Sequence, residues 1–291
     1  MPVILDGKTT AAAIRASVRA SIKQDREKAG RAPCLAVILV GDDPASQTYV
    51  RNKEKACADA AIETASHRLP ANATQQEVEA LIARLNADPA IDGILLQLPL
   101  PKGLDAAPCI HAISPDKDVD GLTIVNQGKM LMGLPGLRPC TPAGILALLD
   151  RYAIATSGKM AAVLGRSELV GRSIAVLLSS QKRNATVTLC HSRTPNVADI
   201  CRKADIIIAA LGKPRFLKAN MVKPGAVIID VGVNRIPDST KKSGFRLIGD
   251  CDFEDLKEKA SYITPVPGGV GPMTIAMLMY NTLEAAENCA N

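Results

Sequence analysis

The chain has 291 residues, of which 47% are hydrophobic and 22% charged, so it is neither an intrinsically disordered nor a low-complexity protein. Its length predicts about two domains. The net charge is only +6 and aromatic residues make up 2% of the chain, which disfavours nucleic-acid binding through stacking platforms and favours small anionic ligands.

Short apolar runs alternate with amphipathic stretches along the chain. The predicted strands are residues 35–40, 64–68, 93–97, 161–164, 186–190, 205–210, 226–231 and 246–248. The predicted helices are residues 9–28, 46–61, 74–86, 141–152, 169–179 and 196–203, with one more after Pro272. Because the strands are continuously apolar, they indicate parallel sheets covered on both faces, and hence an α/β fold. The Gly- and Pro-rich segment 128–142 predicts the boundary between two α/β units.

The N-terminal residues, the short apolar runs and the cysteine pattern favour an intracellular protein. The first residues have neither the basic start nor the apolar stretch of a signal peptide, and the longest apolar runs are too short to span a membrane. The eight cysteines form no CxxC pair, and the three histidines share no ligand spacing. We therefore expect a cytoplasmic protein with buried free thiols and no metal site.

A glycine-containing turn follows the predicted strand 161–164. Residues 165–171 read GRSELVG and lead into an apolar helix, so the turn can offer N–H groups to a phosphate. The spacing alone leaves a purely structural turn open. The next predicted strand is followed by Ser192 and Arg193, where NAD-binding folds carry an acidic residue. Together with Arg166, this hydroxyl and guanidinium favour a 2′-phosphate, and therefore NADP over NAD.

A second group of residues lies near the start of the chain. Ser46, Tyr49 and Lys53 are spaced to share one face of a helix, and a phenol above an ammonium suits proton transfer. A solvated helix face with a core tyrosine fits the same spacing. Tyr49 and Lys53 also form the YxxxK pattern of short-chain dehydrogenases. In those enzymes the pattern follows the dinucleotide loop, whereas here it precedes the turn at 165–171, so that family is disfavoured.

Two later segments also contain candidate functional residues. The apolar strand from residue 93 ends in Gln97, Leu98 and Pro99, at the strand end where open α/β sheets bind ligands. Residues 115–121 then place three carboxylates in one short loop. This loop is either a metal loop, although it lacks the EF-hand spacing, or a charged solvated turn.

Taken in order, these segments resemble the family of bifunctional methylenetetrahydrofolate dehydrogenase/methenyltetrahydrofolate cyclohydrolases of the FolD type, along nearly the whole chain. The residues that carry the resemblance are 40–46, Tyr49, Lys53, 93–101, 117–121, 139–144, 165–171 and 265–274. The resemblance implies a folate-binding catalytic domain (1–138 plus 273–291) and a Rossmann-like NADP-binding domain (139–272), with the active cleft between them. It also implies a last helix that packs on the first domain, and a homodimer formed through the dinucleotide domains.

The same resemblance implies roles for individual residues. Lys53 matches the catalytic lysine, Gln97 the amide that tunes it, Tyr49 the ring against the folate, and Asp120 the carboxylate that binds the pterin. The other substrate-binding positions are Ser46, Leu98, Pro99, Pro267, Gly268 and Gly269. The cofactor-binding positions are Gly165, Arg166, Ser167, Ser192, Arg193, Val231, Gly232, Val233 and Thr274. Three positions depart from the common pattern, namely Glu168, Ser173 and Cys251, and an acid at 168 is expected to weaken nucleotide binding.

The implied activity is oxidation of 5,10-methylenetetrahydrofolate with NADP+, followed by hydrolysis to 10-formyltetrahydrofolate, a one-carbon donor for purine biosynthesis. No metal, nucleic acid or membrane partner is expected. Three alternatives remain at this point: a monofunctional dehydrogenase of the same family, an NADP-dependent dehydrogenase of another small substrate such as a shikimate-like acid, and a non-catalytic nucleotide-binding module.

Overall fold

The computed structural model describes residues 1–29, 31–241 and 244–289, and the chain forms two compact units. Unit 1 contains Met1–Ala11 and Thr141–Thr274, and unit 2 contains Ala12–Cys140 and the chain from Ile275 onward. The chain passes from unit 2 to unit 1 after Cys140 and back to unit 2 after Thr274, in each case two residues beyond the expected boundary. By their contacts residues 1–11 lie in unit 1, because the strand at Val3–Ile4 pairs in parallel with Tyr262–Ile263.

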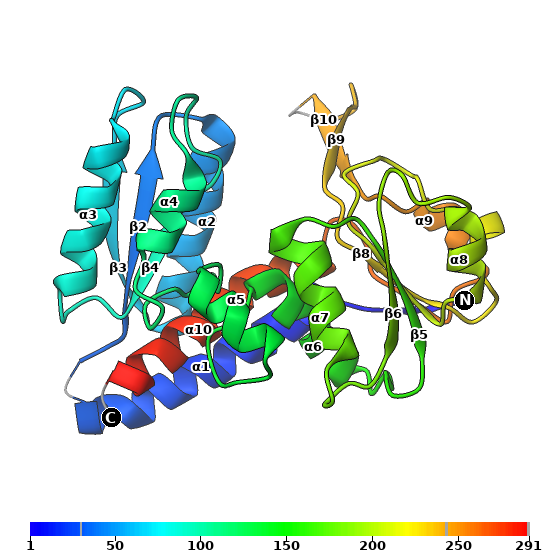
Figure 1. Ribbon diagram of the computed structural model, residues 1–291, viewed down its shortest axis with the longest axis horizontal. Coiled ribbons are helices and arrows are strands. Elements are labelled where there is room, and N and C mark those ends of the chain that lie inside the picture. Colours follow the sequence, from blue (N-terminus) through cyan, green and yellow to red (C-terminus); the bar gives the residue numbers. More distant parts are fainter. Residues whose placement is uncertain (30, 242–243, 290–291) are drawn as a thin grey trace. The chain divides into compact units, whose positions relative to one another are not determined.

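Unit 2 is built on a three-stranded parallel sheet in the order β3-β2-β4 (Figure 1). Its strands are β2 (Cys34–Val40), β3 (Glu63–Leu69) and β4 (Gly93–Leu96). Its helices are α2 (Pro44–Ala60), α3 (Gln75–Ala87), α4 (Ala106–Ala112), α5 (Ile124–Leu131), and most of α1 (Gly7–Ala29) and α10 (Val270–Cys289), both of which begin in unit 1.

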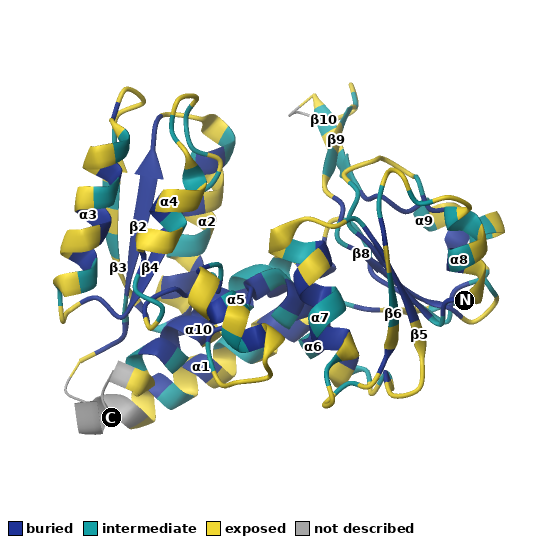
Figure 2. Ribbon diagram, viewed as in Figure 1, coloured by how far each residue is buried: buried dark blue, intermediate teal, exposed yellow. Residues whose placement is uncertain are grey.

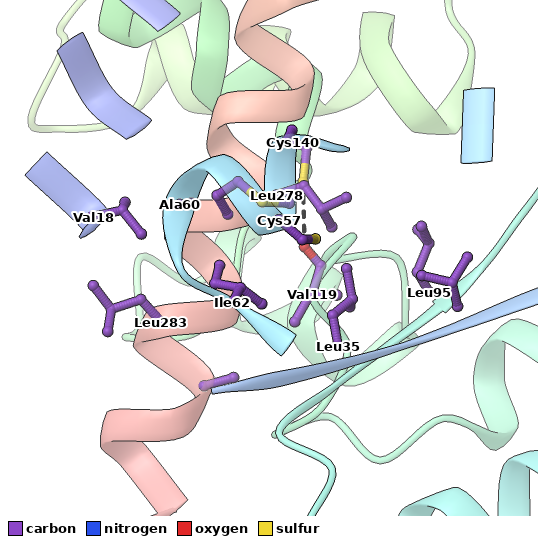
Figure 3. Close-up of a cluster of buried hydrophobic side chains, with 14 of the residues drawn as sticks. Val18, Leu35, Cys57, Ala60, Ile62, Leu95, Val119, Cys140, Leu278 and Leu283 are labelled. Atoms are coloured by element: carbon purple, nitrogen blue, oxygen red, sulfur yellow. Dashed lines mark hydrogen bonds between the residues drawn. The ribbon is translucent and has the colours of Figure 1, made fainter. Parts of the chain in front are cut away.

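The central strand β2 explains why unit 2 has two cores. Leu35, Val37 and Leu39 pack on one face with residues of α1, α2 and α10 (Figure 3). The alternate residues of β2 pack on the other face with α3 and α4. Both faces are therefore buried, as Figure 2 shows, and the continuous apolar run in the sequence is explained by this double burial. The prediction that the last helix packs on this domain is confirmed, since Leu278 and Leu283 belong to the first core.

Unit 1 contains a six-stranded sheet in the order β1-β11-β8-β7-β5-β6, with every neighbouring pair parallel. Its strands are β1 (Val3–Ile4), β5 (Met160–Leu164), β6 (Thr186–Cys190), β7 (Ile206–Ala209), β8 (Val227–Asp230) and β11 (Tyr262–Ile263). Its other elements are α6 (Cys140–Arg151), the π-helical turn η1 (Glu168–Arg172), α7 (Ser173–Ser179), α8 (Val197–Lys203), the 3-10 turn η2 (Ala219–Met221) and α9 (Phe253–Leu256). The predicted α/β class with parallel sheets is confirmed.

Some elements differ from the prediction. The predicted strand at 246–248 exists as β10 (Phe245–Ile248), but it pairs antiparallel with β9 (Asn234–Pro237) in a separate ribbon. The strands β1 and β11 were not predicted, because two residues are too few to carry a periodicity. The predicted helix 169–179 is divided into η1 and α7.

The predicted free thiols are confirmed for the seven cysteines whose side chains are described. Six of them are buried and Cys34 is half-buried. Within the described part of the chain, no helix is long and apolar enough to cross a membrane.

Candidate active site

Ser46, Tyr49 and Lys53 lie along α2, which begins directly after β2. The helix starts here because the Asp43 carboxylate accepts the N–H of Ser46 at 2.7 Å and Pro44 occupies the first turn. Ser46 is 2% exposed, whereas the Tyr49 ring is 49% exposed. Tyr49 is therefore accessible to a ligand, and the alternative of a core tyrosine is wrong.

Lys53 of α2 and Gln97, which follows the end of β4, are in direct contact. The Lys53 ammonium donates a hydrogen bond to Gln97 Oε1 at 3.0 Å. Gln97 follows β4, and its Nε2 donates to the carbonyl of Leu98 at 2.5 Å, which turns Oε1 toward the lysine. The backbone N–H of Gln97 donates to Ile38 of β2 at 2.9 Å, and the residue is 7% exposed. The amide is thus held on both sides, and it offers the lysine a neutral acceptor.

The helix α2 also carries a buried hydroxyl group, that of Ser46. In the described part of the chain, Ser46 Oγ is one of three buried side-chain polar atoms without a hydrogen-bond partner. Leaving such a group unpaired costs about 1–3 kcal/mol, so Ser46 Oγ is suited to bind a substrate or water.

The acidic loop 115–121, which follows α4, is not a fully solvated turn. Asp118 is buried, and its carboxylate accepts the backbone N–H of Thr123 at 2.8 Å and the amide of Asn126 at 3.0 Å. Burial raises the pKa of Asp118, and these hydrogen bonds oppose the shift. Asp116 is exposed and Asp120 half-buried. No three His, Cys, Asp or Glu side chains among the described residues are placed to hold a metal ion.

Cys140 is a buried thiol whose pKa is affected by both Asp120 and Lys53. Burial raises the pKa of the Cys140 thiol well above its usual range, the nearby Asp120 carboxylate adds to the shift, and the Lys53 ammonium opposes it. The thiol donates to the carbonyl of Val119 at 3.2 Å (Figure 3), and Asn281 of α10 donates to the same carbonyl at 2.7 Å. Asn281 was not predicted from the sequence, although it is an amide within a largely apolar helix.

The glycine turn of unit 1 is the second part of the candidate site. Gly165 has φ +110°, and a Cβ there would lie 2.1 Å from the carbonyl oxygen of Ala210. A Cβ at Gly171 would lie 2.0 Å from the carbonyl oxygen of Gly165. Ser167 caps η1 and accepts the N–H of Gly171 at 3.4 Å. The sequence therefore needs both glycines for this turn, and the first N–H groups of η1 have no partner within the helix.

The predicted cations and hydroxyls of unit 1 are exposed. Arg166, Ser167, Ser192 and Arg193 all lie at the surface, and the last two belong to a turn that follows β6. Glu168 forms an ion pair with Arg172, whose guanidinium donates to the Glu168 carboxylate at 3.0 Å. This pair offsets the charge that was expected to weaken nucleotide binding.

The remaining candidate residues also belong to unit 1. Val231, Gly232 and Val233 follow β8, and the hydroxyl groups of Thr141 and Thr274 lie 2.9 Å apart. Residues 267–269 pack against the start of α1, where the Lys8 N–H donates to the Gly268 carbonyl at 3.2 Å. The structure thus places Lys53, Gln97 and Asp120 in unit 2, with Lys53 and Gln97 in direct contact, and it places the candidates from 165 to 274 in unit 1.

Two family models match this chain. The tetrahydrofolate dehydrogenase/cyclohydrolase catalytic domain matches residues 5–120, and the NAD(P)-binding domain of the same family matches residues 139–290. The chain belongs to the tetrahydrofolate dehydrogenase/cyclohydrolase family. The resemblance found in the sequence is therefore confirmed, and so is an α/β enzyme with an NAD(P)-binding domain.

Individual relatives agree over the full length. The bifunctional protein FolD of Oleidesulfovibrio alaskensis is 56% identical and covers 97% of this chain and 96% of its own. The FolD structure from Campylobacter jejuni has a TM-score of 0.94 at 45% identity and covers 99% of both chains. A dehydrogenase-cyclohydrolase of Trypanosoma brucei, solved with NADP cofactor and inhibitor, has a TM-score of 0.95 at 39% identity, covering 100% of this chain and 99% of its own.

Replacement of Gly165 by Ala tests the turn of this family member. A Cβ 2.1 Å from a carbonyl oxygen must displace the turn, so we expect the KM for NADP+ to rise about tenfold or more and the Tm to fall by several degrees. Steady-state kinetics and thermal unfolding measure the two effects. The control is Gly158→Ala, because Gly158 also has a positive φ, +71°, but no atom within 4 Å of a Cβ. Equal behaviour of the two variants would refute the steric argument.

Proposed function

We propose that the chain oxidises 5,10-methylenetetrahydrofolate with NADP+ and then hydrolyses the 5,10-methenyl product to 10-formyltetrahydrofolate. The observation that carries the proposal is the Lys53–Gln97 contact of 3.0 Å at the end of a buried strand, in a chain of this family. A monofunctional dehydrogenase has no need of a lysine held by a fixed amide. For that reason both activities are proposed.

In the first reaction, the chain binds and orients the folate. Asp120 is half-buried beside Cys140, and its carboxylate accepts two adjacent N–H donors of the 2-amino-4-oxo pteridine. The exposed ring of Tyr49 packs on the bound folate, with Leu98 and Pro99 beside Gln97. Orientation is the main contribution of these residues to hydride transfer.

In the second reaction, water attacks the one-carbon bridge, and the tetrahedral intermediate opens at N5. Lys53 transfers a proton from the hydroxyl left by the attacking water to the leaving N5, accepting it as the amine and donating it as the ammonium, while Gln97 holds the side chain in position. The hydroxyl of Ser46 finds its missing hydrogen bond in the substrate or in this water. One proton leaves for each methenyl cation hydrolysed.

The NADP site is assigned to unit 1. The turn at Gly165 and Ser167 opens a helix with free N–H groups, which fits a pyrophosphate. Arg166, Ser192 and Arg193 are exposed and suit the 2′-phosphate, while Val231, Gly232, Val233 and Thr274 complete the site. NADP+ bound there supplies the hydride acceptor.

The enzyme is also proposed to be a cytoplasmic homodimer that joins through unit 1. Strand β6 forms one edge of the six-stranded sheet, and Leu169 and Leu189 are 45% and 36% exposed in this unit. Such an edge is suited to pairing with a second copy. Sedimentation equilibrium should give twice the chain mass of 30.6 kDa, and a concentration-independent monomer would contradict the dimer.

A spectrophotometric assay tests the proposed function. Purified protein receives 5,10-methylenetetrahydrofolate with NADP+ or NAD+, while reduced nicotinamide and the methenyl compound are followed together. We expect NADPH with little accumulated methenyl compound, and direct hydrolysis of added methenyltetrahydrofolate. Accumulating methenyl compound would instead mean a monofunctional dehydrogenase, and no reduction of either cofactor would favour another substrate.

A further inference from the structure

Unit 1 contains two buried carboxylates that the proposed chemistry does not use. Asp230 ends β8 and is 3% exposed, and Asp250 follows β10 and is 0% exposed. Both lie at the carboxyl-terminal side of the central strands, the side on which open α/β sheets bind their ligands.

Asp230 is saturated with backbone donors. Its Oδ1 accepts the N–H of Gly232 at 3.0 Å and that of Asp250 at 2.9 Å. Its Oδ2 accepts the N–H of Cys251 at 2.9 Å. One side chain therefore joins the segment after β8 to the segment after β10.

Asp250 extends the connection to a third segment. Its Oδ2 accepts the N–H groups of Leu211 and Gly212, at 2.5 and 2.8 Å, from the loop after β7. Its Oδ1 accepts the side-chain amide of Asn234 at 2.9 Å. The two carboxylates thus fix three loops through a single chain of hydrogen bonds.

Two glycines lie directly against the two carboxylates, and a side chain at either glycine would overlap an aspartate. A Cβ at Gly232 would lie 2.2 Å from Asp250 Cγ, and a Cβ at Gly249 would lie 1.8 Å from Asp230 Oδ2. These glycines let the loops run directly over the carboxylates, so the geometry of residues 231–233 depends on both acids.

The arrangement does not serve stability in an obvious way. Burial raises the pKa of Asp230 to about 6, Asp250 adds to the shift, and the three N–H donors oppose it. Buried charges are costly and are often replaceable by apolar groups without loss of stability, so their benefit lies in the geometry that they specify.

We propose that Asp230 and Asp250 are positioning residues that hold the loop Val231–Gly232–Val233 in the shape needed to bind NADP. The inference rests on the proposed assignment of this loop to the cofactor. Neither acid needs to touch the cofactor, because each acts through the backbone of the three loops.

The test is Asp230→Asn. Three N–H donors converge on the two carboxylate oxygens, so an amide at 230 must direct its NH2 group at one or more of them. We expect the kcat/KM for NADP+ to fall about 10- to 100-fold. Hydrolysis of methenyltetrahydrofolate needs no hydride acceptor, so it should stay within about twofold of the wild-type rate.

Asp205→Asn is the matched control. Asp205 lies at the opposite end of the same sheet, before β7, and accepts the N–H of Met160 at 2.8 Å and the Lys223 ammonium at 2.7 Å. We expect both activities of this variant to stay within about twofold of wild type, because the changed contacts lie away from the three loops.

Asp250→Asn keeps the proposal testable if Asp230→Asn does not fold. Here Asn234 can turn its amide and accept from the new NH2 group, so the loop contacts survive in part, and we expect a smaller loss of about 3- to 10-fold in kcat/KM for NADP+. The proposal is overturned if the folded variant at 230, or failing that the variant at 250, has wild-type kinetics for NADP+. It is also overturned if dehydrogenase and cyclohydrolase fall equally. Failure of the proposed function itself would be visible separately, as a wild-type protein that reduces no NADP+.

Discussion

Replacement of Lys53 by Met should abolish the cyclohydrolase and leave a measurable dehydrogenase. Methionine keeps the apolar stem but removes the ammonium that Gln97 holds at 3.0 Å, so the proton transfer of the hydrolysis loses its carrier. General acid–base catalysis is worth roughly 10²- to 10⁴-fold, and we expect a loss of that size. Hydride transfer needs no proton at this position.

The two activities of the Lys53 variant are measured separately, with methylene- and methenyltetrahydrofolate as substrates. Lys55→Met is the control, because Lys55 lies exposed on the same helix, and it should leave both rates unchanged. If a folded Lys53 variant lost both activities to the same extent, the lysine would bind substrate instead of moving a proton.

Replacement of Asp120 by Ala should weaken both reactions together. The change removes two charge-assisted hydrogen bonds to the pterin, each worth about 1.5–3 kcal/mol. We therefore expect kcat/KM to fall roughly 10²- to 10⁴-fold for each reaction, with a matching loss of folate affinity.

Isothermal titration with a folate and the two rate assays measure these effects. Asp116→Ala is the control from the same loop, because Asp116 is exposed, and it should behave like the wild type. An unchanged folate affinity in Asp120→Ala would assign the pterin to another residue.

Much of the fold could be predicted because its signals are local. The run 35–40 is apolar at every position, since Leu35 and Ala36 face different cores, and this pattern is typical of a parallel strand. The strand β6 was predicted with its bounds, and most helices to within a few residues. Spacing also placed Tyr49 and Lys53 on one helix, but only the resemblance to a known family associated them with Gln97 and Asp120.

The rest depends on contacts between residues that are far apart in the chain. Val3 pairs with Tyr262, and neither segment is long enough to carry a period of its own. Asp230 and Asp250 of unit 1 were not predicted to be functional, because in the sequence a buried aspartate cannot be distinguished from one in a surface turn. Asp118 illustrates the same limit, since its burial depends on Asn126 and Thr123 closing over it.

The chain passes between the two units three times, after Ala11, Cys140 and Thr274, and this affects how the protein folds during synthesis. Unit 1 needs its first residues at β1 and their partners at β11, and unit 2 needs Leu278 and Leu283 of α10 for its core. Domains usually fold one after another as the ribosome releases them. Here unit 1 is incomplete until Thr274 has emerged and unit 2 until α10 has emerged, so truncation at residue 140 should leave no independently stable unit.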